Sequence, residues 1–186
     1  MATTKNTLQL KTPTQLLKED HDEVQGKLSR LEDIFGHLDR QAEVAAELKE
    51  LAAFFETDFW VHFTKEEDAL FPELEKYLPK DQGPIGVMLE EHVELRETNR
   101  QLQKAISAYF ALGNNPERKE LIRKYGNRFI YALRDHIDKE NSVLFELTEA
   151  NLTKKQVETV SKGFEKIAAE HQARKASPGG CCCSSS

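Results

Sequence analysis

Two stretches of this chain repeat each other: His62-Phe-Thr-Lys-Glu66-Glu-Asp-Ala-Leu70-Phe71 and His136-Ile-Asp-Lys-Glu140-Asn-Ser-Val-Leu144-Phe145. The same residue, in turn His, Lys, Glu, Leu and Phe, stands at five matched positions. Positions four apart on an α-helix lie one turn from each other on the same face, so the imidazole and carboxylate of each stretch point the same way. Each stretch therefore predicts a helix that presents a His-Glu pair to one site.

The segments before these two stretches contain a weaker echo of each other. An acidic pair precedes a histidine in Glu19-Asp20-His21 and again in Glu90-Glu91-His92. The spacing agrees, because His21 and His92 are 71 residues apart and His62 and His136 are 74 apart. The chain thus predicts two similar helical hairpins, each of which supplies one lone histidine and one His-x-x-x-Glu pair.

Helix-forming residues dominate the rest of the chain, and its few Gly and Pro residues mark the ends of long segments. Apolar residues recur at helical spacing within each segment. We expect helices over residues 13–38, 42–77, 84–112, 117–150 and 153–175, with Pro72 bending or interrupting the second. Thr12 is the expected N-cap of the first helix, because Pro13 suits the first helical position.

Short connections between the first four helices predict an all-α fold, an antiparallel up-and-down four-helix bundle over residues 13–150. A shorter C-terminal helix within residues 151–175 packs outside the bundle through an apolar face of Val157, Val160, Phe164 and Ile167. Residues 176–186 are rich in Ser, Gly and Cys, and we expect a flexible, disordered tail because this composition cannot bury a core.

All three cysteines of the chain, Cys181, Cys182 and Cys183, lie in that tail. They leave no disulfide framework to hold the body of the protein together. Three interpretations of the run stay open: an inert tail, a redox or soft-metal handle, and a lipidation site.

The composition limits the classes of partner. Of the 186 residues, 39% are hydrophobic and 31% charged, and the formal net charge is −6, without the clustered Lys and Arg that nucleic acid requires. No apolar run reaches the roughly 18 residues of a membrane span, and residues 1–13 lack the apolar stretch of a signal peptide. We therefore expect a cytoplasmic protein that binds neither nucleic acid nor a membrane.

Antiparallel packing brings the starts of the first and third helices beside the ends of the second and fourth. Six groups can then meet at one level, nearer one end of the bundle: His21, His62, Glu66, His92, His136 and Glu140. Buried carboxylates are costly unless they are paired or metal-bound. Carboxylates with imidazoles suit iron, manganese or zinc, and six ligands are too many for one tetrahedral zinc. We interpret the set as a site for two iron ions, with positions for water, an oxo or hydroxo bridge, or a diatomic ligand.

The order His, His-x-x-x-Glu, His, His-x-x-x-Glu across four helices resembles the hemerythrin-like (HHE cation-binding) domains over about residues 13–150. The resemblance implies a non-haem di-iron protein that binds dioxygen, nitric oxide or peroxide for sensing or stress response. It also implies a ligand set: His21 and His62 on one iron, His92 and His136 on the other, and Glu66 and Glu140 as bridges. A ferritin-like site would need Glu-x-x-His motifs, and none of the six histidines has a Glu three residues before it.

The chain departs from the oxygen-carrying hemerythrins at one ligand. Those proteins have a fifth histidine four residues from the third, whereas Met88 and Arg96 hold the flanking positions here. Glu67, Glu94 and solvent are the candidates for the missing place. Two other functions stay open: iron storage or donation, for example to iron–sulfur cluster repair, and a peroxide-decomposing enzyme. The sequence offers no dedicated acid, base or substrate pocket, so no catalytic residue is assigned.

Other aromatic and histidine residues receive ordinary interpretations. Phe59 and Phe63 are expected to pack around the metal site together with the repeated Leu-Phe pairs. His37 and His171 fall outside the pattern and are interpreted as surface histidines. Tyr131 lies on the second motif helix, where we expect ordinary packing, or else a role near the site as the donor of a hydrogen bond or an electron.

Overall fold

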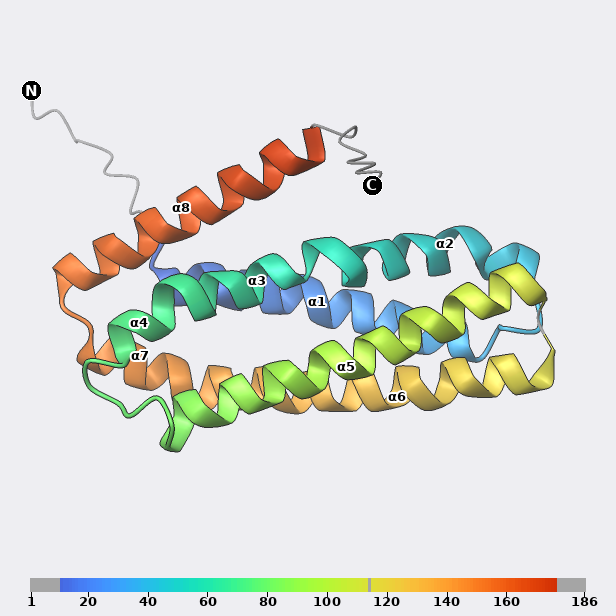
Figure 1. Cartoon of the computed structure of the whole chain (residues 1–186), viewed down its shortest axis with the longest axis horizontal. Helices are drawn as coiled ribbons and strands as arrows, with labels where there is room; N and C mark the ends of the chain where they lie inside the picture. The colour runs from blue at the N-terminus through green and yellow to red at the C-terminus, as the bar shows by residue number, and fades with distance from the viewer. Residues whose placement is uncertain (1–10, 114, 177–186) are drawn as a thin grey trace, which may run out of the picture.

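The computed structural model describes residues 11–113 and 115–176, and four long helical segments run alternately up and down in it (Figure 1). The first segment is α1 (Pro13–Phe35) and the third is α5 (Gly83–Leu112). The second comprises α2 (Gln41–Ala53), η1 (Phe54–Asp58), α3 (Trp60–Lys65), η2 (Glu66–Leu70) and α4 (Phe71–Leu74). The fourth comprises α6 (Pro116–Lys139), η3 (Glu140–Leu144) and α7 (Phe145–Asn151). The predicted all-α bundle is confirmed.

The helix ends lie within a few residues of the predicted positions. The Thr12 side chain accepts a hydrogen bond from the backbone N–H of Gln15, whose own side chain accepts one from the Thr12 N–H. This reciprocal cap fixes the start of α1 where the sequence indicates it. α1 ends at Phe35 rather than at residue 38, because the Gly36 N–H turns back to the carbonyls of Asp33 and Ile34. The second segment likewise ends at residue 74 rather than 77.

The last helix, α8 (Lys154–Ala176), returns along the outside of the bundle and packs on α1, α3 and η2 (Figure 1). Val160 and Phe164 are its buried residues. Gly163 allows a close approach, because a Cβ there would lie 2.7 Å from the Cβ of Ala69 in η2. Residues 177–186, with the three cysteines of the predicted tail, lie outside the described residues.

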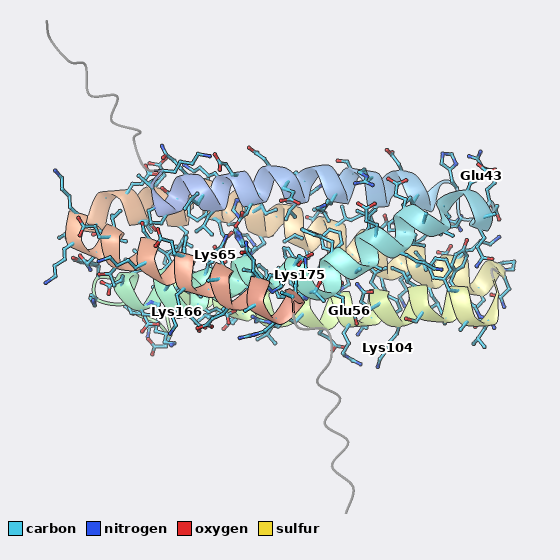
Figure 2. All side chains as sticks on the ribbon, turned by 90° about the horizontal axis from the view of Figure 1, so that it is seen from above. Glu43, Glu56, Lys65, Lys104, Lys166 and Lys175 are labelled. Atoms are coloured by element: carbon cyan, nitrogen blue, oxygen red, sulfur yellow. The ribbon has the colours of Figure 1, made fainter. Side chains whose placement is uncertain are left out.

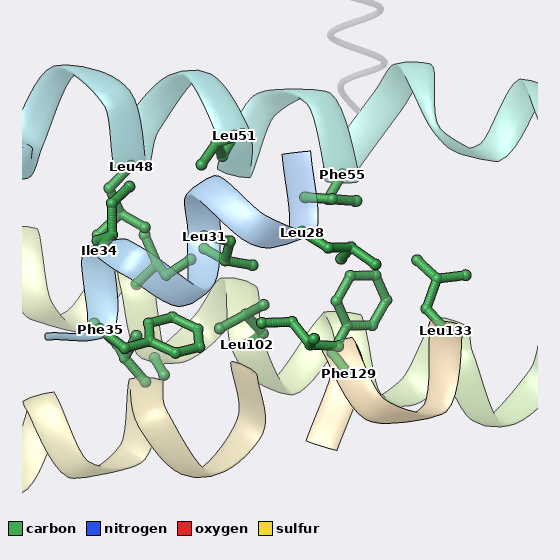
Figure 3. Close-up of a cluster of buried hydrophobic side chains, with 14 of the residues drawn as sticks. Leu28, Leu31, Ile34, Phe35, Leu48, Leu51, Phe55, Leu102, Phe129 and Leu133 are labelled. Carbon is green, nitrogen blue, oxygen red and sulfur yellow. The ribbon is translucent and has the colours of Figure 1, made fainter. Parts of the chain in front are cut away.

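Two apolar clusters fill the bundle, and charged side chains such as Lys104 and Lys166 lie on its outside (Figure 2). The larger cluster joins the first four segments, and Figure 3 shows Leu28, Leu48 and Phe129 among its buried side chains. The smaller joins Leu17, Leu70, Phe71, Leu74, Ile85, Met88, Leu144 and Phe145 to Val160 and Phe164 of α8. Among the described residues, no helix is long and apolar enough to cross a membrane.

The second and fourth segments each contain a π-helical turn that begins at the glutamate of the repeated stretch. In η2 the Phe71 N–H bonds to the carbonyl of Glu66, and in η3 the Phe145 N–H bonds to that of Glu140. The extra residue in such a turn lets two consecutive side chains face the core, which explains the repeated Leu-Phe pair. The helical segment is not interrupted at Pro72, which lies in the first turn of α4, so of the two expected effects of this proline only bending stays a prediction.

Two glycines inside helices provide a test of the packing. A Cβ at Gly126 would lie 2.1 Å from the Phe35 ring, whereas a Cβ at Gly26 would meet nothing within 4 Å. We expect Gly126→Ala to lower the free energy of unfolding by about 1–2 kcal/mol, since overpacking outweighs the gain in helix propensity. Gly26→Ala should raise it by about 0.5–1 kcal/mol. Denaturant unfolding measures both, and equal stability of the two variants would contradict the close helix contact.

Candidate metal centre

All six residues predicted from the sequence lie together between the two apolar clusters. They come from six elements: His21 from α1, His62 from α3, Glu66 from η2, His92 from α5, His136 from α6 and Glu140 from η3. None of the six is more than 5% exposed, and both glutamates are fully buried. The fold therefore places two carboxylates and four imidazoles in one water-excluded space.

Glu140 contacts histidines of both hairpins. Its Oε2 lies 3.0 Å from Nε2 of His21 and 3.9 Å from Nε2 of His62. Its Oε1 lies 3.3 Å from Nε2 of His136. The two oxygens of this carboxylate thus face different groups of imidazoles.

Glu66 occupies the matched position in the repeated stretch of the second segment. Its Oε1 lies 3.4 Å from Nε2 of His62, and its Oε2 lies 3.4 Å from Nε2 of His92. Each carboxylate therefore spans the boundary between a histidine of the first hairpin and one of the second.

The ligand atoms form two compact groups. Glu66, His92, His136 and Glu140 form one and His21, His62 and Glu140 the other, and within each group the ligand atoms lie within 4.8 Å of one another. Glu140 belongs to both groups, which is the arrangement that a carboxylate shared by two cations requires.

The buried polar atoms of the cluster fit a cation. Both oxygens of Glu66 and of Glu140, and Nε2 of His92 and of His136, make no hydrogen bond although they are buried. The Nε2 atoms of His21 and His62 face each other at 3.1 Å. Buried acceptors gathered in this way are costly without a positive charge among them. The donor set of nitrogen and oxygen atoms suits iron, manganese or zinc.

An outer ring of acceptors orients the four imidazoles. The Nδ1 atoms lie at hydrogen-bond distance from side-chain oxygens: His21 from Asn141 at 3.0 Å, His62 from Asp20 at 3.3 Å, His92 from Glu67 at 2.6 Å and His136 from Glu91 at 2.9 Å. A proton on each Nδ1 leaves the lone pair on Nε2, which is the nitrogen that faces the cluster. The ring thus selects the tautomer that binds a metal.

The repeated Phe residues also fix the lone histidines. The Phe145 ring stacks on His21 with ring centroids 5.4 Å apart, and the Phe71 ring stacks on His92 at 5.9 Å. Phe63 lies against the His92 ring at 3.7 Å. The expected aromatic packing around the site is confirmed, and it limits rotation of the imidazoles.

Cations keep the outer carboxylates ionised. Hydrogen bonds from His136 and Lys139 hold the pKa of Glu91 below its ordinary value. Burial by itself would raise the pKa of Asp20, but hydrogen bonds from His62 and Lys65 outweigh it and lower that pKa. Lys65 and Lys139 occupy the matched Lys position of the two stretches, which gives that repeated residue its role.

The electrostatics of the inner cluster reflect the two buried carboxylates. Burial by itself would lower the pKa of His136, but attraction to the nearby Glu140 carboxylate and the hydrogen bond to Glu91 raise it to about 9. Burial is likewise outweighed at His62, where Glu66 contributes most to raising the pKa well above its ordinary value. Without metal, protons on these imidazoles provide the positive charge that the carboxylates require.

The candidates for the missing fifth ligand lie elsewhere. Glu67 bonds to Nδ1 of His92 and to Arg96, so it belongs to the outer ring. Glu94 is exposed and bonds to Arg128. Met88 is buried in the smaller apolar cluster. No other carboxylate or imidazole of the described residues joins the groups of ligand atoms.

Three further sequence interpretations have different outcomes. Tyr131 is 77% exposed, so both the expected packing and the alternative role near the site are wrong. His37 is exposed as expected. His171 lies in α8 and is half-buried, because its Nε2 bonds to Asp58 at 2.8 Å.

Sequence reasoning missed the outer ring as a functional feature. Asp20 and Glu91 directly precede the lone histidines, and Glu67 and Asn141 directly follow the paired glutamates. The matched positions were a visible signal, but the pairing depends on how the helices are rotated against each other.

Two hollows adjoin the cluster on one side. A cleft of about 710 Å³ lies under α8, and Asp20, Val24, Phe59, His62 and Lys65 are among its lining residues. A narrow gap, without room for a water molecule, lies between His21, His62, His136 and the side chains of Val24, Phe59, Phe63, Leu133 and Ile137. Val24, Phe59 and His62 line both hollows.

A comparison with family models decides the relationship. The hemerythrin HHE cation binding domain matches residues 12–148, which is most of the chain. The chain belongs to the hemerythrin HHE family. Comparisons with curated proteins and with solved structures give no match. Cation binding by HHE domains agrees with the buried His/Glu cluster, which fits a metal site.

The raised pKa values predict how cation binding by this HHE domain depends on pH. A histidine with a raised pKa stabilises the folded, metal-free state below its ordinary pKa of 6.5, and this stabilisation is lost as the pH rises through about 9. A cation must displace the same protons, so we expect its apparent affinity to rise between these pH values and then to level off.

Titration calorimetry in buffers of different ionisation enthalpy measures how many protons the protein releases when a cation binds. Roughly two should be released per chain at pH 7 if His62 and His136 both give one up. His37→Ala is the control, because its side chain is exposed and outside the cluster. An affinity that stays constant over this pH range would contradict the assignment.

Proposed function

We propose that this HHE domain is a non-haem di-iron protein that binds dioxygen or nitric oxide at its buried centre. The observation that carries the proposal is the pair of ligand groups that share Glu140, with an apolar gap beside them. Sensing or stress response in the cytoplasm is the role we infer, since the gap beside the imidazoles leaves no room for a larger substrate.

The proposed ligands follow the two groups of atoms. His21 and His62 hold one iron, His92 and His136 hold the other, and Glu66 and Glu140 each contribute one oxygen to either side. The distances from Glu66 and Glu140 to histidines of both hairpins support this bridging role. A ferrous pair supplies electrons and open coordination positions for a small ligand.

The gap beside the cluster favours a small, uncharged ligand. Apart from the three imidazoles, its lining residues are Val24, Phe59, Phe63, Leu133 and Ile137, none of which offers a side-chain hydrogen bond. A ligand that enters must push these side chains aside, which limits it to very few atoms. Dioxygen and nitric oxide suit such a lining better than peroxide, which would lose hydrogen bonds to water there.

The same burial favours a resident metal over an iron cargo. All six ligands are at most 5% exposed, and the outer ring holds each imidazole in place. Rapid donation of iron would have to break several of these hydrogen bonds at once. We therefore rank iron storage or donation behind ligand binding.

Metal analysis tests the proposed centre. Protein produced with ample iron should contain about two irons per chain, and Glu140→Ala should bind one or none because Glu140 serves both groups. Glu94→Ala, which removes an exposed glutamate, should retain both irons. The optical spectrum of the reduced protein should change on exposure to air. Far less than two irons and an unchanged spectrum would sink the proposal.

Access to the gap provides a second test. Val24 lines both hollows and is 4% exposed, so Val24→Phe should slow the binding of nitric oxide to the reduced protein and Val24→Ala should speed it. Stopped-flow spectroscopy measures the rates. Val44→Phe and Val44→Ala are matched controls, since Val44 packs in the same apolar cluster but lines neither hollow. Equal rates in all four variants would exclude entry past Val24.

A further inference from the structure

The outer ring repeats with the pseudo-symmetry of the chain, and the matched partners have the same charge in one pair and different charges in the other. Within each hairpin, the paired histidine bonds to the acid before the lone histidine: His62 to Asp20 and His136 to Glu91. Between hairpins, the lone histidine bonds to the residue after the paired glutamate: His92 to Glu67 and His21 to Asn141. The matched positions 67 and 141 therefore hold a carboxylate in one case and an amide in the other.

The distances divide in the same way. On the His92–His136 side, the two Nδ1 contacts measure 2.6 Å and 2.9 Å, and both acceptors are carboxylates. On the His21–His62 side they measure 3.0 Å and 3.3 Å, and one acceptor is the amide of Asn141. The first side thus has the shorter contacts and the stronger acceptors.

Each acceptor acts on the metal-binding nitrogen through the ring. A carboxylate that accepts the Nδ1–H draws the proton toward itself, so the opposite Nε2 becomes a better electron donor; an amide oxygen does this less. Every outer carboxylate is paired with a cation, as Glu67 is with Arg96 and Glu91 with Lys139. Asn141 carries no charge, so His21 is the one imidazole with a neutral partner.

The two sides also differ in their surroundings. Asp20, His62 and Lys65 line the cleft under α8, whereas His92 and Glu66 line neither that cleft nor the narrow gap. His62 is the most exposed of the six proposed ligands at 5%, and His92 is fully buried. The side with the weaker acceptors is therefore also the side nearer solvent.

We propose that the two metal positions have unequal affinities and that the Glu67/Asn141 difference sets the order of filling. The His92–His136 position fills first and holds its ion more tightly. The His21–His62 position fills second and holds its ion less tightly. The inference rests on the proposed two-metal site and adds to it a specific role for two residues outside the ligand set.

Stepwise titration of the metal-free full-length protein with Co²⁺, in competition with a chelator, measures the two affinities. Visible absorption follows each step. Outer-shell partners typically change metal affinity by 10- to 100-fold, so the wild-type steps should be separated by about tenfold or more. His21→Ala should retain the tighter step, and His92→Ala should lose it.

Isosteric variants assign the difference to positions 67 and 141. Glu67→Gln should weaken the tighter step by about 10- to 100-fold and leave the weaker one unchanged. Asn141→Asp should strengthen the weaker step and leave the tighter one unchanged. Glu94→Gln is the matched control, because Glu94 lies on the helix of His92 but bonds only to Arg128 at the surface.

The outcomes separate the inference from the proposed function. If the protein binds two Co²⁺ ions and neither Glu67→Gln nor Asn141→Asp changes either affinity, the proposed order of filling is overturned but the two-metal site is not. Equal weakening of both steps by Glu67→Gln would also overturn it, since a general loss of packing has that effect. A wild-type protein that binds no ion would overturn both.

Discussion

The structure depends on the burial of two carboxylates among four imidazoles. Placing an ion in a protein interior costs several kcal/mol even after relaxation, and Glu66 and Glu140 are both fully buried. Positive charge inside the cluster offsets that cost. When no metal is bound, attraction to Glu66 and Glu140 outweighs burial and raises the pKa values of His62 and His136, so protons on these imidazoles provide it. A pair of cations would provide it more fully, because all the unpaired acceptors face one space.

The need to position the two carboxylates and four imidazoles explains the π turns, the stacked Phe residues and the outer hydrogen bonds together. The π turns start at the two glutamates and direct the following Leu and Phe into the core. The Phe residues then stack on the lone histidine of the other hairpin, and the residue after each glutamate bonds to the same imidazole. Each repeated stretch therefore supplies a ligand pair and, across the hairpin boundary, the support for a third ligand.

The sequence was sufficient for the helical class and for gathering the six residues, because both follow from spacing along single helices. The outer ring of acceptors could not be predicted, because it depends on how the helices are rotated against each other. The bonds from His62 to Asp20 and from His136 to Glu91 are examples. The π turns were not predicted, because a search for apolar residues with a period of 3.6 does not include them. The adjacent Leu and Phe that follow each glutamate were the sequence signal for these turns. Tyr131 was predictable: five residues before His136 it points about 140° away from that histidine, toward solvent.

The pseudo-symmetry of the ligands does not extend to α8, which packs on the side of the bundle formed by α1, α3 and η2. The cleft beneath it reaches His62, and Asp58 binds both His171 and Lys175 of α8 at its edge. On the same side, Asn141 gives His21 a neutral partner. A weaker hold on the metal and a route to solvent therefore coincide in one half. The other half combines carboxylate acceptors with full burial of His92. In the proposed site, the ion at the His92–His136 position is therefore the more tightly bound, and the ion at the His21–His62 position is the one that an entering ligand reaches.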